Sequence, residues 1–88
     1  MAWTIEYLES VQKDMRKIDR QTQQRIKKYL KERIIVHDDP RQLGKPLSGE
    51  LSGFWRYRVG DYRLICELQD EVMTVLVVQV GHRREIYR

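Results

Sequence analysis

Apolar and polar residues alternate with two different periods in the first part of the chain. Segment 3–7 (WTIEY) alternates and is rich in aromatic and β-branched residues, which predicts a strand. From Leu8 onward the apolar residues recur at helical spacing, as Leu8, Val11, Met15 and Ile18. We therefore expect a strand followed by an amphipathic helix.

A second helix is predicted directly after the first. Asp19 is a suitable N-cap, and the apolar spacing continues as far as Ile34. Pro40 disfavours a helical conformation at the preceding residue, so the helix should end before it. The two helices are expected to form a hairpin, and a loop should follow to Gly53.

Three strands are predicted to close the chain, at 54–59, 62–68 and 72–80. Gly60-Asp61 suits a two-residue hairpin turn with glycine first, as in type II′. The last strand, VMTVLVVQV, is apolar on both faces, which indicates an internal position in the sheet. The expected order is β-α-α-β-β-β in one domain over residues 1–88. This is an α+β fold with a helical hairpin packed on a four-stranded, mostly antiparallel sheet.

Three arginines of the predicted hairpin share one face of this sheet. Alternation along the strand puts Trp55 and Tyr57 on the core face and Arg56 and Arg58 on the other face. A two-residue turn then places Arg63 directly opposite Arg58. Like charges in that arrangement destabilise a sheet by up to about 1 kcal/mol. Either these arginines are solvated beside nearby acids, or they form an anion site, for which the planar guanidinium is suited.

The C-terminal segment favours the anion site. VGHRREIYR (80–88) adds basic and aromatic residues at the edge of the same sheet: His82, Arg83, Arg84, Tyr87 and Arg88. Such residues can clamp phosphate, carry a proton near neutral pH and stack on a base.

Charge and composition narrow the classes of partner. The net charge of +4 makes a polyanion partner plausible. Residues 8–36 hold nine Lys/Arg against four Asp/Glu, a basic helical surface that we interpret as mainly solvated. Cys66 is the one cysteine, so no internal disulfide forms, and its core-facing position indicates packing. His37 beside two acids reads as a solvated helix end, so neither a metal nor a cofactor is expected.

Membrane insertion is not expected. The longest apolar run has nine residues, whereas a spanning helix needs about 20. The N-terminus does not resemble a signal peptide, and the chain should be soluble and cytoplasmic.

GKPLSGELSGFWRYRVGDYRLI followed by VLVVQVGHRREIYR resembles the RelE/ParE toxin superfamily, and specifically its RelE-like branch that cleaves messenger RNA. The resemblance extends over essentially the whole chain and includes IDRQTQQRIKKYL. It implies a metal-independent endoribonuclease toxin that cuts mRNA in the ribosomal A site by attack of the 2′-hydroxyl. It also implies neutralisation by a cognate, RelB-like antitoxin.

The resemblance implies two sets of site residues. The catalytic residues would be Arg63, Arg83, Tyr87 and His82, and the phosphate-binding residues Arg56 and Arg58. Arg84 of the basic C-terminal segment is a further phosphate-binding candidate. The best-studied branch has lysines at the positions of Arg56 and Arg58. Because arginine effectively does not lose its proton, these two residues are poor candidates for a general base.

Two other functions are compatible with the same residues. One is a ParE-like inhibitor of DNA gyrase without ribonuclease activity, since one fold carries both functions. The other is a non-catalytic module that binds an antitoxin or nucleic acid.

Overall fold

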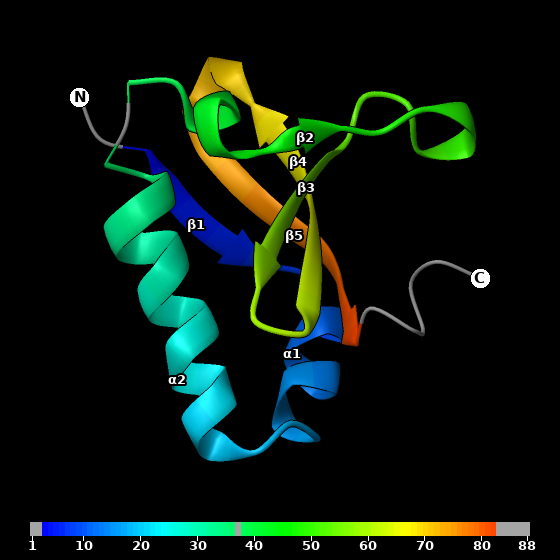
Figure 1. Cartoon of the computed structure of the whole chain (residues 1–88). Coiled ribbons are helices and arrows are strands. Elements are labelled where there is room, and N and C mark those ends of the chain that lie inside the picture. Colours follow the sequence, from blue (N-terminus) through cyan, green and yellow to red (C-terminus); the bar gives the residue numbers. More distant parts are fainter. Residues whose placement is uncertain (1–2, 37, 83–88) are drawn as a thin grey trace.

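The computed structural model describes residues 3–36 and 38–82, which form an α+β structure with one mixed sheet (Figure 1). The strand order is β1-β5-β4-β3-β2; β1 runs parallel to β5, and the other pairs are antiparallel. The elements are β1 (Thr4–Tyr7), α1 (Glu9–Arg16), α2 (Arg20–Tyr29), β2 (Lys45–Pro46), β3 (Trp55–Val59), β4 (Tyr62–Gln69) and β5 (Thr74–His82).

Helix α2 begins and ends through identifiable hydrogen bonds. The Asp19 carboxylate accepts from the Thr22 backbone N–H at 3.0 Å and from the Thr22 hydroxyl at 2.7 Å, which confirms the predicted N-cap. A π-helical turn, Leu30–Ile34, continues the helix, and the Ile35 N–H donates to the Leu30 carbonyl at 3.1 Å. The helical segment therefore reaches Ile34, as predicted.

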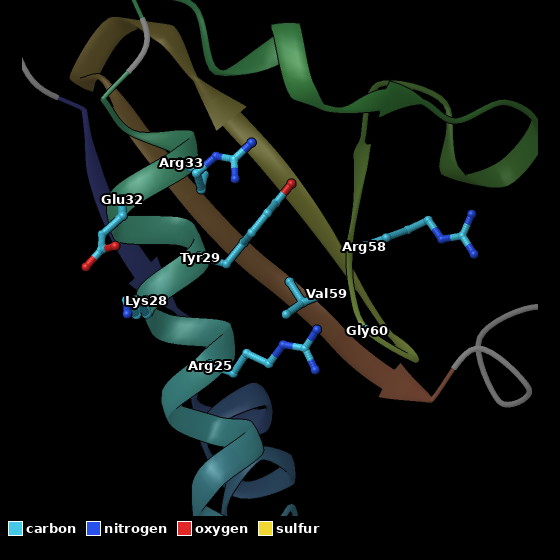
Figure 2. Close-up of a pocket in the computed structure, with 8 residues that line it drawn as sticks. All are labelled: Arg25, Lys28, Tyr29, Glu32, Arg33, Arg58, Val59 and Gly60. Atoms are coloured by element: carbon cyan, nitrogen blue, oxygen red, sulfur yellow. The ribbon is translucent and has the colours of Figure 1, made fainter.

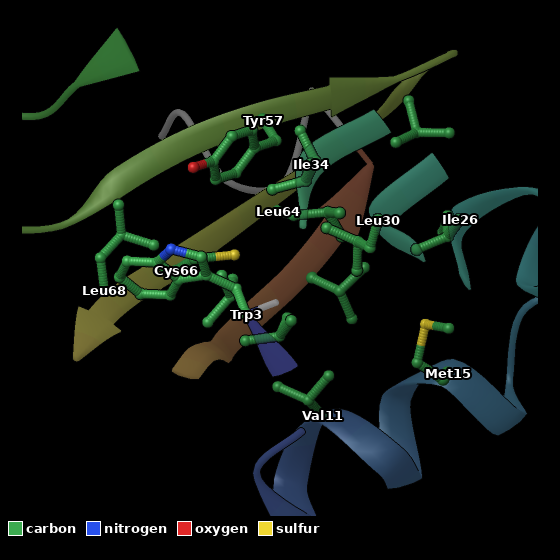
Figure 3. Close-up of a cluster of buried hydrophobic side chains, with 14 residues drawn as sticks. Trp3, Val11, Met15, Ile26, Leu30, Ile34, Tyr57, Leu64, Cys66 and Leu68 are labelled. Carbon is green, nitrogen blue, oxygen red and sulfur yellow. The ribbon is translucent and has the colours of Figure 1, made fainter. Parts of the chain in front are cut away.

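Both helices pack on the same face of the sheet, as expected (Figures 1 and 3). We call this the covered face and the other the open face. The core of the covered face contains Trp3, Val11, Met15, Ile26, Leu30, Ile34, Tyr57, Val59, Leu64, Cys66, Leu68, Val75, Val77 and Val80. Cys66 is fully buried, and burial raises the pKa of its thiol, so this residue packs rather than reacts.

A β-bulge reconciles the apolar last strand with a single core. Ile65 pairs with Gln79, but the next residue of β4, Cys66, pairs with Val77, so Val78 is the additional residue. The bulge lets both Val80 and Val77 lie on the covered face despite their odd spacing. Strand β5 is internal, between β1 and β4, as predicted.

The sequence prediction was wrong by one or two residues at five strand boundaries and in the number of strands. Strand β3 starts at Trp55 rather than at 54, and β4 ends at Gln69 rather than at 68. Strand β5 starts at Thr74 rather than at 72, because Asp70–Val72 form a 3₁₀ turn, and it extends to His82. The first strand starts at Thr4 rather than at 3. A fifth strand, Lys45–Pro46, pairs with β3. Two residues that include a proline carry no periodic signal, so this strand could not be predicted.

The hairpin β3–β4 has the predicted register. Val59 pairs with Tyr62 and Arg58 with Arg63. Gly60 has φ +60°, whereas Asp61 does not have a positive φ, which agrees with glycine in the first position of a type II′ turn.

Within the described residues, no helix is long and apolar enough to cross a membrane.

Candidate functional site

The open face carries a basic row across three strands. Arg58 lies directly opposite Arg63 across β3–β4, and Arg56 lies opposite Ile65. On the other side of β3, Lys45 of β2 lies directly opposite Arg56. Because paired residues share a face, these four cations point to the same side of the sheet. We call Lys45, Arg56, Arg58 and Arg63 the basic row.

The basic row lies over an apolar floor. Ile65 has no exposed surface, although it is on the open face and outside the main core. Arg56, its cross-strand partner, and Arg63, two residues earlier on β4, are both partly buried, and their Nε atoms are buried. Arg58 is exposed. The aliphatic stems of Arg56 and Arg63 therefore lie against the sheet, as is usual for long charged side chains beside apolar surface.

Lys45 is a member of the row that sequence reasoning missed. It lies in the glycine- and proline-rich loop, and only its pairing with β3 brings it beside Arg56. The position of β2 depends on Gly44, since a Cβ there would lie 2.9 Å from the ring of Tyr57. The Tyr57 hydroxyl donates to the Pro40 carbonyl at 2.8 Å and ties the same loop to β3.

An ion-pair network holds the loop before β2. The Arg41 guanidinium contacts Asp70 (Nη2 to Oδ2, 2.6 Å) and Asp39 (Nη1 to Oδ1, 3.0 Å). The Arg41 hydrogen bond lowers the pKa of the Asp70 carboxyl below its ordinary value. The Arg41 guanidinium also lies 5.8 Å from the centre of the Trp55 ring. These contacts position β2, and with it Lys45, beside β3.

His82 lies on the other face from the basic row. It pairs with Tyr62, whose neighbours Leu64 and Cys66 face the core, and the His82 and Tyr62 rings meet edge to face with centroids 5.6 Å apart. The residue opposite Arg63 is Gly81. The sequence grouped His82 with the arginines, whereas the register separates them. Arg83, Arg84 and Tyr87 lie outside the described residues, as does His37.

A pocket of about 360 Å³ lies between α2 and the β3–β4 hairpin (Figure 2). We call it the α2–β3 groove. Figure 2 shows the side chains of Arg25, Tyr29 and Arg33 directed from the helix toward the strands, while the Arg58 side chain points away from α2. The groove is lined by Arg25, Lys28, Tyr29, Glu32, Arg33, Arg58, Val59 and Gly60.

The chemistry of both surfaces is that of anion binding. Guanidinium groups donate paired hydrogen bonds to phosphate oxygens and keep their charge at any physiological pH. Among the described residues, there is no group of three or more His, Cys, Asp or Glu that could hold a metal ion. The open face can therefore bind a phosphodiester with several cations at once.

Known proteins resemble the chain both in sequence and in fold. Toxin RelG of Mycobacterium tuberculosis is 46% identical over 50 residues, which is 57% of this chain and 58% of that protein. Toxin RelE of the same organism is 35% identical over 51 residues, 58% of this chain and 53% of that protein. The chain thus spans little more than half the length of these curated relatives.

Solved structures match over nearly the whole chain. The RelBE2 toxin–antitoxin complex of M. tuberculosis gives a TM-score of 0.85 at 28% identity, covering 94% of this chain and 100% of that chain. The E. coli RelBE complex gives 0.73 at 27% identity, covering 92% and 96%. Residues 5–87 match the ParE toxin family of type II toxin–antitoxin systems, parDE. The chain therefore belongs to this family and, with it, to the RelE/ParE superfamily of toxins.

Proposed function

We propose that the chain is the toxin of a type II toxin–antitoxin system and acts as a metal-independent endoribonuclease on mRNA in the ribosomal A site. The observation that carries this proposal is the direct opposition of Arg58 and Arg63 within the basic row. Folding alone does not favour like charges opposite one another. An RNA phosphodiester between the guanidinium groups would turn this repulsion into binding.

In the proposed reaction the 2′-oxygen of the RNA attacks the adjacent phosphorus. The new 2′-O–P bond gives a 2′,3′-cyclic phosphate, and the P–O5′ bond breaks to release a 5′-hydroxyl. One proton leaves the attacking hydroxyl and one is delivered to the leaving oxygen. Negative charge grows on the phosphorane, and preorganised cations are usually the largest catalytic contribution in such reactions.

The arginines take complementary roles in this proposal. Arg56, Arg58 and Arg84 bind the scissile and neighbouring phosphates. Arg63 also contacts the phosphorane, and Arg83 stabilises the transition state or the leaving oxygen. The partly buried Arg56 and Arg63 are held against the sheet, so they would be ordered before substrate arrives.

Proton transfer has two proposed carriers. Tyr87 would orient or stack on the nucleotide, and nearby cations would favour its ionised form as a base. His82 is the second candidate because imidazole titrates near neutral pH. His82 lies on the covered face. A role for it would therefore require the substrate to reach around the end of β5.

The ribosome and an antitoxin are the proposed partners. RelG and RelE are named as toxins, and the solved RelBE structures are toxin–antitoxin complexes. By analogy, a RelB-like antitoxin would neutralise this chain in the cytoplasm. With arginine at 56 and 58 the acid–base groups are weak, so the ribosome would be needed to orient the RNA. Free RNA should be cut slowly or not at all.

Translation in vitro tests the proposal directly. Purified protein is added to a programmed translation reaction, and the 5′ ends of the message are mapped on stalled ribosomes. We expect cuts within A-site codons, and a loss of about 10²- to 10³-fold in cleavage rate for Arg63→Ala or Arg83→Ala. Circular dichroism should show that both variants are folded. Full activity in both variants would end the assignment of these arginines.

A gyrase inhibitor is the second candidate, and the match to the ParE toxin family is the observation in its favour. It predicts intact messages together with blocked supercoiling of plasmid DNA by gyrase. Running both assays on the same preparation separates the two functions.

A further inference from the structure

We propose that the α2–β3 groove is a second RNA-backbone site, which binds phosphates away from the position of cleavage. The inference rests on the proposed function to the extent that RNA is the partner. It adds a surface formed mainly by the α2 helical segment, whose basic residues the sequence analysis interpreted as a mainly solvated helix face.

The groove presents an aromatic ring between two cations. Arg25, Tyr29 and Arg33 recur every four residues, so they follow one side of the helical segment, and about 12 Å of helix separates the two arginines. Figure 2 shows all three side chains directed toward the strands. The Arg25 guanidinium reaches the hairpin, where its Nη1 would lie 3.2 Å from a Cβ placed on Gly60.

The charge of the groove is positive, and no ion pair between described residues neutralises it. Arg25, Lys28 and Arg33 line it from the helical segment, whereas Arg58 lines it from β3 with its side chain pointing away from α2. Glu32 is the one acid among the lining residues. Within 3–36 and 38–82, the two ion pairs are both formed by Arg41, on the loop before β2. Cations that no carboxylate contacts can exchange their counterions for phosphates, which is the main source of affinity for a nucleic-acid backbone.

The combination of positive charge and an aromatic ring in the groove favours RNA over an acidic protein segment as the ligand. A cationic groove with an aromatic side chain is the usual composition of a surface that binds single-stranded nucleic acid. The half-buried Tyr29 ring is held by the core, so it would stack on a base without much loss of freedom. Arg58 belongs to both the groove lining and the basic row, so one strand of RNA can pass over β3 between the two surfaces.

The test compares two double variants that lose equal charge on the same helical segment. Arg25→Gln/Arg33→Gln alters the groove, whereas Lys27→Gln/Lys31→Gln alters exposed residues that line a different pocket, beside β1. The probe is a 2′-O-methylated 12-nucleotide RNA, which has no attacking hydroxyl and therefore cannot undergo the proposed cleavage. Binding is measured from 50 to 200 mM salt.

We expect the groove variant to reduce the slope of log K against log salt by about 1.4, which is two contacts at about 0.7 each, and the control variant to reduce it much less. Tyr29→Leu should weaken binding about 5- to 100-fold through lost stacking, while Tyr29→Phe binds like the wild type. Equal slopes for the two double variants would overturn the proposal. So would a groove variant that loses more affinity for poly-glutamate than for the RNA, since the occupant would then be a protein segment.

The result of the groove experiment can be distinguished from the result of the cleavage assay that tests the proposed function. A wild-type protein that does not cut A-site codons contradicts the ribonuclease, whereas the slope experiment still tests the groove. If the double variant is misfolded by circular dichroism, Arg25→Gln and Lys27→Gln alone make the same comparison.

Discussion

The two faces of β3 and β4 differ completely, although their side chains alternate along the same two strands. On the covered face, Tyr57 and Leu64 are almost fully buried under the helices. On the open face, one residue along each strand, Arg58 and Arg63 oppose one another. Apolar burial stabilises the first arrangement, at about 25 cal/mol per Å². Like charges directly opposite one another do not favour folding, and the proposed binding of RNA would account for the second arrangement.

The open face also contains a packed element. Ile65 has no exposed surface, and the partly buried Arg56 and Arg63 lie beside it. A small apolar floor of this kind gives long cationic side chains a fixed starting point. The open face thus combines local packing with several cations on one side of the sheet, as a preorganised anion site requires.

The largest expected effect comes from the covered face. Leu64→Ala should lower the free energy of unfolding by about 2–5 kcal/mol, because it removes methyl groups from a site with no exposed surface. Urea unfolding at neutral pH measures it. Arg58→Gln, on the exposed open face, is the control and should change stability by less than about 1 kcal/mol. Similar losses in both variants would refute the distinction between the faces.

Ile65 tests the apolar floor of the open face. Ile65→Val removes one methylene and should cost about 0.5–1.5 kcal/mol in the free energy of unfolding, as in a main core. The same urea titration applies. A neutral result would mean that the floor is not tightly packed, and that Arg56 and Arg63 are not supported by it.

Removing one member of the like-charge pair should give a small gain in folding stability. Arg58→Gln should raise the free energy of unfolding by a few tenths to about 1 kcal/mol at low salt, because Arg63 loses its repulsive partner. The gain should shrink in high salt, which screens exposed charges. The same variant should cut messages more slowly in the translation assay. A loss of stability at low salt would show that Arg58 is a structural residue.

The last prediction concerns folding stability in alkaline solution, and it involves no difference at neutral pH. Burial raises the pKa of Tyr7 to about 12, and it also raises the pKa values of Tyr57 and Cys66. A raised folded-state pKa means that stability is present below the unfolded-state pKa, near 8.5 for cysteine and 10 for tyrosine, and declines above it. Urea midpoints should therefore fall between pH 9 and pH 11.

Tyr7→Phe provides the matched comparison for this alkaline decline. It removes one of the three titrating groups, so its midpoint should fall less steeply with pH than that of the wild type. Arg58→Gln should follow the wild-type profile, because an arginine does not titrate in this range. A wild-type urea midpoint that does not change between pH 9 and pH 11 would show that Tyr7, Tyr57 and Cys66 are not desolvated.

Much of the fold followed from local patterns. The change of period after Leu8, the Asp19 cap and the Gly60-Asp61 turn each depend on neighbouring residues only, and the structure confirms them. The same turn set the register that brings Arg58 opposite Arg63. The family resemblance, carried by motifs on and after the hairpin, was confirmed over residues 5–87.

Other features required the tertiary structure. Lys45 joined the basic row only through a two-residue strand, and the bulge at Val78 was hidden in an evenly apolar run. The placement of His82 opposite Tyr62 and the groove beside α2 depend on pairings between segments far apart in the chain. Period and capping are encoded within a few residues. The face and neighbours of a side chain at a strand end depend on the partner strand, which local sequence does not specify.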